Sequence, residues 1–285
     1  MKKIALSIAT VALLGLSSVS INAQQLRVPA PSPLATLDQS FALSNIKIEY
    51  SRPSARGRVV FGDVVPFGKV WRTGANASTK ITFGEDVTVE GKSLKAGTYA
   101  LYTIPNRDSW DVMFYRDLNL GGNVADYKAE NEVARINVRP STLANKVETF
   151  TINVANVNTN SAQVEMNWEN TRVAFNVTAD IDSKIMRSIE TALAADTRPY
   201  YQAASYYYDN NKDMNQALSW VTKAVDQNPK AFWVAHLKAK IQMRLKDYKG
   251  AIQSAEQSMA LAREAKNDDY VKMNEKLISD AKAGR

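Results

Sequence analysis

Between residues 44 and 180 the chain alternates apolar and polar side chains with the period of a β-strand. In residues 45–50, and again in residues 149–154, every second side chain is apolar. Such a period places the apolar side chains on one face of a strand. No helical segments separate these runs as βαβ units would require, so we expect an antiparallel β-sandwich, or a barrel of similar topology. The dipeptides Glu-Gly at 90–91 and Glu-Asn at 169–170 are expected to form hairpin turns.

Beyond residue 180 the apolar period becomes that of an α-helix. Ile185, Ile189 and Leu193 are spaced as one helix face, and the Asp-Ser pair at 182–183 fits a helix N-cap. The prolines that follow fit the first turns of short antiparallel helices. We therefore expect the rest of the chain to be helical.

A repeat is present within this helical part. Residues 211–218 align with residues 245–252 at an offset of 34 residues (245 minus 211), which is the tetratricopeptide period. Lys238 and Gln242 stand where that repeat expects apolar side chains, so the repeats are degenerate. The expected fold class is therefore multidomain: the β-sandwich domain is followed by an all-α, tetratricopeptide-like domain over residues 181–285, whose last helix closes the stack.

The start of the chain has the pattern of a secretory signal peptide. Two lysines precede an apolar run of 16 residues, from residue 4 to residue 19, which is shorter than the roughly 20 residues that span a bilayer. The small residues that follow fit cleavage after Ala23; a retained N-terminal anchor is the alternative. The protein is thus expected in the periplasm or outside the cell, with membrane contact only through residues 1–23. Residues 24–41, which are rich in proline, are expected to form an extended tether before a β domain over residues 42–180.

Composition excludes several classes of protein. The chain has no cysteine, which removes disulfides, thiol catalysis and lipid attachment through cysteine. A single histidine, His236, leaves little basis for a Ser-His-Asp triad or a multi-histidine metal site. The formal charge of +7 falls to +5 without Lys2 and Lys3, and residues 24–180 carry 17 basic and 16 acidic side chains. We therefore expect no nucleic-acid partner, no metal and no cofactor.

Arginine, aromatic and glycine residues are concentrated between residues 50 and 79. This stretch contains Ser-Arg-Pro at 51–53, Gly-Arg-x-x-Phe-Gly at 57–62 and the string Val-Pro-Phe-Gly-Lys-Val-Trp-Arg-Thr-Gly-Ala-Asn at 65–76. With Ala-Gly-Thr-Tyr-Ala-Leu-Tyr-Thr-Ile-Pro at 96–105 and Trp110, it resembles the secreted bacterial proteins grouped as domain of unknown function 2911. The resemblance covers roughly residues 42–180. It implies the boundaries of a β domain and implies no reaction.

The same stretch provides a candidate ligand site, because guanidinium groups bind planar anions through paired hydrogen bonds and aromatic rings offer a stacking face. The expected ligand is a small anionic or carbohydrate molecule. A structural interpretation stays open, in which Arg72 pairs with Asp63, Asn76 bonds the loop backbone and Trp71 belongs to the core. The candidate ligand-binding residues are Arg52, Arg56, Arg58, Trp71, Arg72, Thr73 and Asn76.

Tyrosines cluster at 200–201 and 206–208, and a helix cannot bury three consecutive side chains on one face. Tyr201, Tyr207 and Tyr208 are therefore candidate contacts for an envelope protein or peptide, because exposed tyrosines are rigid and amphipathic. The alternative is that these rings pack against the β domain. Together these features favour an exported binding or scaffold protein without catalytic activity.

Two further functions remain open from the sequence. A glycan-active hydrolase or lyase needs two carboxylates on either side of a glycosidic bond, and Glu49 and Asp63 are the candidate pair near the arginines. A calcium-stabilised structural module is the other, but the acidic residues lack the dense spacing of a calcium-binding loop.

Overall fold

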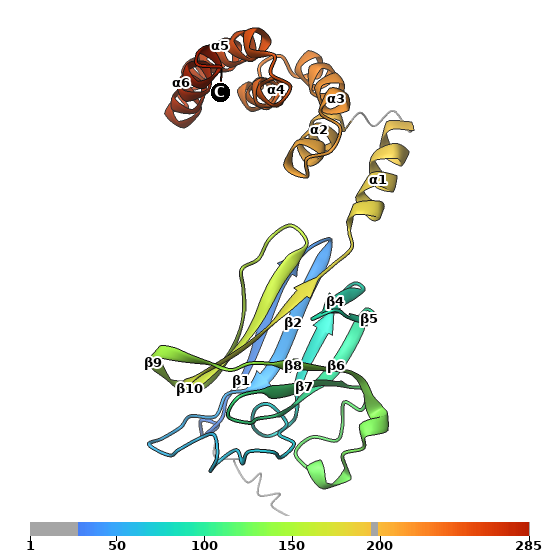
Figure 1. Cartoon of the computed structure of the whole chain (residues 1–285), viewed down its shortest axis with the longest axis vertical. Helices are drawn as coiled ribbons and strands as arrows, with labels where there is room; N and C mark the ends of the chain where they lie inside the picture. Colours follow the sequence, from blue (N-terminus) through green and yellow to red (C-terminus); the bar gives the residue numbers. More distant parts are fainter. Residues whose placement is uncertain (1–27, 195–198, 285) are drawn as a thin grey trace, which may run out of the picture.

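The computed structural model describes residues 28–194 and 199–284. Within these ranges, residues 34–178 form two antiparallel sheets and residues 182–282 form six helices, which Figure 1 shows beyond one end of the sheets. This confirms the predicted order of a β domain followed by a helical domain. The predicted signal peptide, residues 1–23, lies outside the described residues.

The larger sheet has six strands in the order β1-β2-β3-β6-β7-β8. Residues 34–41, which the sequence analysis assigned to the tether, form the edge strand β1 and pair antiparallel with β2. The β domain thus begins about one strand earlier than expected. The strands are β1 (Leu34–Phe41), β2 (Ser44–Ser51), β3 (Thr79–Phe83), β6 (Gly97–Ile104), β7 (Trp110–Tyr115) and β8 (Glu132–Val138).

The smaller sheet has the order β5-β4-β10-β9 and contains β4 (Val87–Val89), β5 (Lys92–Leu94), β9 (Ser141–Ala155) and β10 (Ser161–Thr178). Glu90 and Gly91 join β4 to β5 with φ values of 43° and 80°, which confirms that predicted hairpin. The hairpin predicted at 169–170 is wrong. Glu169 has a φ of 50° but lies inside β10, where the pairing with β9 shifts register. A residue with positive φ serves a bulge as well as a turn, so the sequence signal is the same for both.

The two sheets enclose one apolar core with aromatic side chains at one end. Trp71 and Trp168 stack with ring centroids 5.9 Å apart, and Phe61 meets the edge of Trp110 at 4.9 Å. Strand alternation explains this core, because the apolar positions of β2, such as Ile46 and Ile48, are fully buried while the residues between them face outward.

A second, smaller core lies on the outer face of the larger sheet. Residues 116–131, called here the cover segment, contain the short helices η1 (Val124–Asp126) and η2 (Ala129–Asn131) and pack on Tyr102 and Tyr115. The Tyr102 hydroxyl donates to the Gly121 carbonyl at 2.9 Å, and the Tyr115 hydroxyl accepts from the Lys128 amide at 3.0 Å. These bonds fasten the cover segment to β6 and β7.

The helices are α1 (Asp182–Ala194), α2 (Tyr200–Asp209), α3 (Met214–Gln227), α4 (Phe232–Arg244), α5 (Tyr248–Glu264) and α6 (Asp268–Lys282). The predicted repeat corresponds to the hairpins α2-α3 and α4-α5. Asp213 and Asp247, which are 34 residues apart, both accept backbone hydrogen bonds as N-caps of the second helix of each hairpin. Helix α6 packs on α5, as expected for a closing helix.

The degenerate position Gln242 is buried and fully bonded. Its amide nitrogen donates to Asp247 at 2.9 Å, and its oxygen accepts from Ser254 at 2.7 Å. A buried polar side chain costs little when both of its ends are paired, so glutamine is tolerated where the repeat expects an apolar residue.

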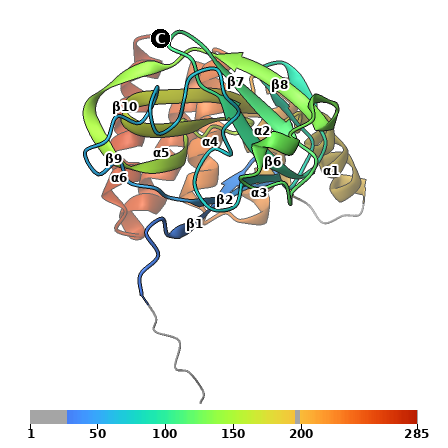
Figure 2. The same cartoon turned by 90° about the horizontal axis from the view of Figure 1, so that it is seen from below.

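Helix α1 joins the two domains, and ion pairs lie at the junction. The Asp182 carboxylate accepts from the Tyr206 hydroxyl and from Lys212, both at 2.6 Å. Lys184 pairs with the buried Glu85 of the β domain at 2.8 Å. Seen from below in Figure 2, the helices lie behind the sandwich. None of the helices in residues 28–194 and 199–284 combines the length and apolar character needed to cross a bilayer.

Candidate functional site

Three of the four predicted arginines bind backbone carbonyl groups. Arg52 donates to the Phe150 carbonyl at 3.1 Å and to Thr151 at 2.8 Å, which ties residues 52–55 to β9. Arg58 donates to the carbonyls of two neighbouring residues at 3.0 Å, and Arg56 donates to the Pro31 carbonyl at 3.1 Å. Because their partners lie on different segments, the structure does not show these guanidinium groups lining one cleft.

Two other predicted ligand residues, Trp71 and Thr73, are buried inside the sandwich. Trp71 is part of the aromatic core, and its indole nitrogen donates to the Gly74 carbonyl at 3.0 Å. Thr73 is completely buried and bonds the Thr103 hydroxyl at 3.2 Å. The prediction that these two line an open cleft is therefore wrong. Strand alternation turns Trp71 inward and Arg72 outward, which a sequence reading of an irregular loop cannot establish.

Arg72 lies on the outer face of the larger sheet, beneath the cover segment. A β-carbon built on Gly122 would approach its Nη1 atom to 2.8 Å, so the guanidinium packs directly against the glycine backbone. Asp63 is exposed, and no ion pair joins it to Arg72. The predicted Arg72–Asp63 pair is thus absent, whereas Asn76 does bond the loop, donating to the Ser32 carbonyl at 3.2 Å and to Ser51 at 3.3 Å.

The loop from Arg72 to Ser78 carries strain and unpaired polar atoms. Thr73 has a φ of 55°, a conformation that branched side chains rarely adopt. Arg72 Nε and Ser78 Oγ are both buried without a hydrogen-bond partner. Burial raises the pKa of the neighbouring Tyr102, and Ser78 and Arg72 oppose that shift. A water molecule or a small ligand group would satisfy these atoms.

The candidate catalytic carboxylates lie on different elements. Glu49 projects from the outer face of β2 and pairs with Lys47 at 3.3 Å, while Asp63 lies exposed in the loop after residue 60. A hydrolase or lyase acting through this pair stays a prediction. Within residues 28–194 and 199–284, no group of three or more acidic or histidine side chains could hold a metal ion.

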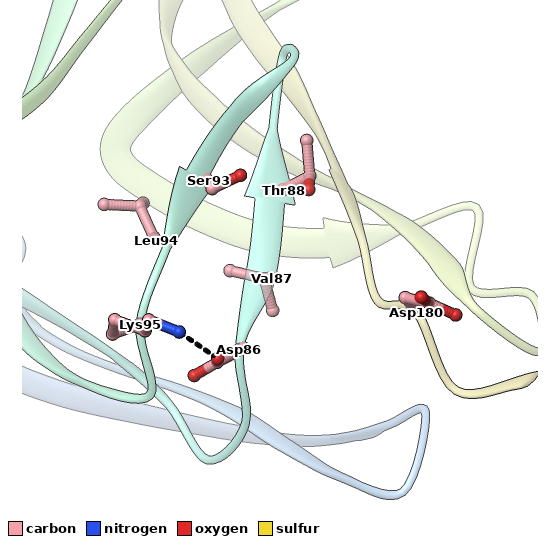
Figure 3. Close-up of a pocket in the computed structure, with 7 residues that line it drawn as sticks. All are labelled: Asp86, Val87, Thr88, Ser93, Leu94, Lys95 and Asp180. Atoms are coloured by element: carbon pink, nitrogen blue, oxygen red, sulfur yellow. Dashed lines mark hydrogen bonds and ion pairs between the residues drawn. The ribbon is translucent and has the colours of Figure 1, made fainter. Parts of the chain in front are cut away.

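A hollow at the β4-β5 hairpin is closed off by its own charges. Figure 3 shows Lys95 reaching toward Asp86, with Asp180 projecting from a separate segment. Lys95 and Asp86 are 2.8 Å apart, and Asp86 also accepts from the Ala96 amide at 2.9 Å. These two bonds hold the pKa of the Asp86 carboxyl below its usual range. The pair satisfies itself, so this hollow offers no free charge to a ligand.

The helical domain contains a larger hollow, called here the helical groove, with a volume of about 480 Å³. Its walls come from the first helices of the two hairpins and from the closing helix α6. The lining residues are Tyr208, His236, Lys240, Met243, Arg244, Met273, Lys276, Leu277 and Asp280.

Positive charge gathers at one wall of the helical groove. The ammonium nitrogen of Lys240 lies 4.5 Å from the centroid of the Tyr208 ring, and the guanidinium carbon of Arg244 lies 4.9 Å from it. Lys276 is paired with Asp280 at 2.9 Å, which leaves Lys240 and Arg244 without a carboxylate partner in the described residues. The groove therefore has an excess of positive charge beside apolar side chains.

His236 forms the inner edge of the groove. Its Nδ1 atom lies 2.7 Å from the Asn274 amide oxygen, and its ring meets the edge of Tyr270 at 5.4 Å. Burial lowers the pKa of His236 below its usual value, Lys240 lowers it further, and Asn274 opposes the shift. His236 is therefore a packed helix residue, as the sequence indicated.

The predicted partner-binding tyrosines separate. Tyr208 lines the groove, and Tyr201 is half-buried seven residues earlier on the same helix. Tyr207 is buried against Trp220 at 4.8 Å, so it cannot touch a partner, and that part of the prediction is wrong. Lys240 and Arg244 were missed from the sequence, although their spacing of four residues from His236 and from each other marks one helix face.

The comparisons with known proteins concern the β domain. A family model described as protein of unknown function (DUF2911) matches residues 32–177, which is more than half of the chain. This range includes β1 and ends within β10. Neither a curated protein nor a solved structure shows significant similarity to the chain.

Proposed function

Because the chain belongs to the DUF2911 family, whose function is unknown, we propose a function from its geometry: an exported binding protein whose helical groove holds an acidic segment of another protein. The observation that carries this proposal is the pair of cations, Lys240 and Arg244, on the face of Tyr208 in the groove. Their charge is not neutralised by a carboxylate, so an acidic partner would supply one.

The remaining lining residues determine what else the partner offers. Met243, Met273 and Leu277 give the groove an apolar wall, and the Met273 side chain is 42% exposed. Exposed methionine adapts its shape to different apolar groups. The proposed partner therefore carries an acidic side chain beside an aliphatic or aromatic one, as an extended peptide or one turn of a helix.

A peptide selection tests this proposal. Residues 24–285, which include every described residue, would be used to select binders from a random peptide library. Enriched peptides should combine Asp or Glu with a neighbouring apolar residue. Affinity measured by fluorescence anisotropy should fall at least about tenfold, or 1.4 kcal/mol, in the double variant Lys240→Glu and Arg244→Glu.

The control variant changes the same charge elsewhere on the domain. Lys230 and Lys249 are exposed and do not line the groove. The double variant Lys230→Glu and Lys249→Glu should retain peptide binding apart from a small effect that salt removes. If selected peptides bind the groove variant as well as the unchanged protein, the groove is not the partner site.

A further inference from the structure

A third hollow, called here the sandwich-end hollow, opens at the end of the β domain where β6 ends and β7 begins. It has a volume of about 240 Å³. Figure 1 shows the loops that follow β2 and β6 at the end of the sandwich away from the helices. The lining residues are Phe61, Phe67, Asn106, Arg107, Trp110, Pro140, Ser141, Thr142 and Thr171.

An irregularity between β9 and β10 forms one wall of this hollow. Glu169 pairs with Val147, but Thr171 pairs with Thr142, so two steps along β10 correspond to five along β9. The extra residues of β9 bow outward, and the start of the strand separates from the sandwich end. Bulges of this kind redirect side chains at binding sites. Here the bulge sets Thr142 and Thr171 opposite each other at the mouth.

The floor and the opposite wall are aromatic. Phe61 and Phe67 are half-buried, and Trp110 lies beneath them with its ring centroid 4.9 Å from that of Phe61. The guanidinium carbon of Arg107 lies 5.2 Å from the centroid of the Phe67 ring. The hollow thus offers flat apolar faces with one fixed cation beside them.

Around these rings lie hydrogen-bonding groups that the described protein leaves unused. The Asn106 amide and the hydroxyls of Thr142 and Thr171 have no hydrogen-bond partner among the described residues, and no carboxylate lines the hollow. Donors and acceptors are therefore available for a polar ligand, while a metal cation finds no anionic ligand here.

We propose that the sandwich-end hollow binds one acidic sugar unit of a glycan. A sugar ring presents C–H groups on one face, which pack on Phe61 or Phe67, and hydroxyls at its edge, which bond Asn106 and the two threonines. A sugar carboxylate accepts paired hydrogen bonds from Arg107. The volume lies below the roughly 300 to 1,000 Å³ of most ligand pockets, so it holds one ring rather than a longer chain.

This site is independent of the helical groove and lies at the opposite end of the molecule. The absence of a lining carboxylate makes it a binding site and not a hydrolytic one. Together the two sites would let the protein hold a glycan at one end and a protein segment at the other.

Isothermal titration calorimetry tests the site on residues 24–285. The probes are short oligosaccharides of galacturonic and of glucuronic acid, and neutral oligosaccharides of galactose and glucose of the same length. At least one acidic sugar should bind, and its neutral counterpart should bind at least about tenfold more weakly. Arg107→Gln should weaken binding of the acidic sugar by a similar factor, and Thr171→Val by a smaller one.

Arg139→Gln is the matched control, because Arg139 is exposed, lies next to the lining residue Pro140 and does not itself line the hollow. It should leave binding of the acidic sugar unchanged, as should the groove variant at Lys240 and Arg244. The proposal is overturned if no acidic sugar binds at millimolar concentration, if Arg107→Gln has no effect, or if Arg139→Gln weakens binding equally. None of these outcomes bears on the helical groove.

Discussion

Tyr206, Tyr207 and Tyr208 are consecutive on α2 and make three different kinds of contact. Tyr206 donates to Asp182 at the domain junction, Tyr207 packs in the core of the helical domain, and Tyr208 receives two cations in the groove. Successive residues of a helix are rotated by about 100°, so three neighbours face three directions. One short sequence thus serves the junction, the core and the proposed binding site.

Gly122 provides a prediction at this scale. Because an added β-carbon would approach Arg72 Nη1 to 2.8 Å, Gly122→Ala should destabilise the β domain by about 1 to 3 kcal/mol. Thermal unfolding measures this as a loss of about 2 to 4 °C per kcal/mol. In an Arg72→Ala background the same substitution should cost much less. Equal costs in both backgrounds would mean that the guanidinium does not pack on the glycine.

At the scale of the element, α6 is joined to the helices beside it by a buried polar network. Asn274 is fully buried, and its amide nitrogen donates to Ser258 at 2.8 Å and to the Tyr270 carbonyl at 2.7 Å. Its amide oxygen lies against His236 of α4, and Ser258 donates to the Phe232 carbonyl. A fully paired network orients a helix more specifically than apolar contacts alone.

His236 makes the stability of this element depend on pH. Its pKa is below 6.5 when folded and about 6.5 when unfolded, so the unfolded chain binds more protons between these two values. The stabilisation is present above pH 6.5 and is lost as the pH falls toward the folded pKa. The single histidine gives one imidazole signal by NMR, whose midpoint should lie below 6.5.

The matched variant is His236→Gln, which keeps a polar side chain beside Asn274 but cannot titrate. Its melting temperature should fall less than that of the unchanged protein as the pH is lowered just below 6.5. An imidazole midpoint at or above 6.5 would contradict the burial of His236 as described.

At the scale of the whole molecule, polar contacts at α1 accompany a small apolar junction. Ile185 packs against the cores of both domains, while Asp182 and Lys184 form ion pairs on either side of it. Exposed ion pairs contribute about 0 to 1 kcal/mol, but the Glu85 carboxylate is buried and also accepts from the Leu43 amide at 2.9 Å. The domain arrangement should therefore depend on Glu85 and Asp182 more than on other surface charges.

Spin labels measure that dependence, and the absence of cysteine allows two cysteines to be introduced without a background thiol. Labels at the exposed positions Asp63 and Lys249 report the distance between the domains. The double variant Glu85→Gln and Asp182→Asn should broaden the distance distribution. Lys95→Gln, which breaks an ion pair within the β domain, should not. A distribution that stays narrow in the double variant would show that the apolar contacts alone hold the junction.

The order of the elements could be predicted from local pattern. The period of two in residues 45–50, the stripe of Ile185 and Ile189, and the offset of 34 residues all specify structure through contacts close in sequence. The family motifs also located the β domain, apart from its first strand, because β1 differs from an extended tether only in having a partner.

The tertiary structure alone decided which side chains share a surface. The arginines at 52–58 bond carbonyls of distant segments, and the same loop that turns Trp71 into the core turns Arg72 out beneath Gly122. The sandwich-end hollow exists only where Thr142 and Thr171 are paired across the sheets' edge by the bulge. Local periodicity determines the face on which a residue lies, whereas a site requires several elements to converge, and that convergence depends on long-range packing.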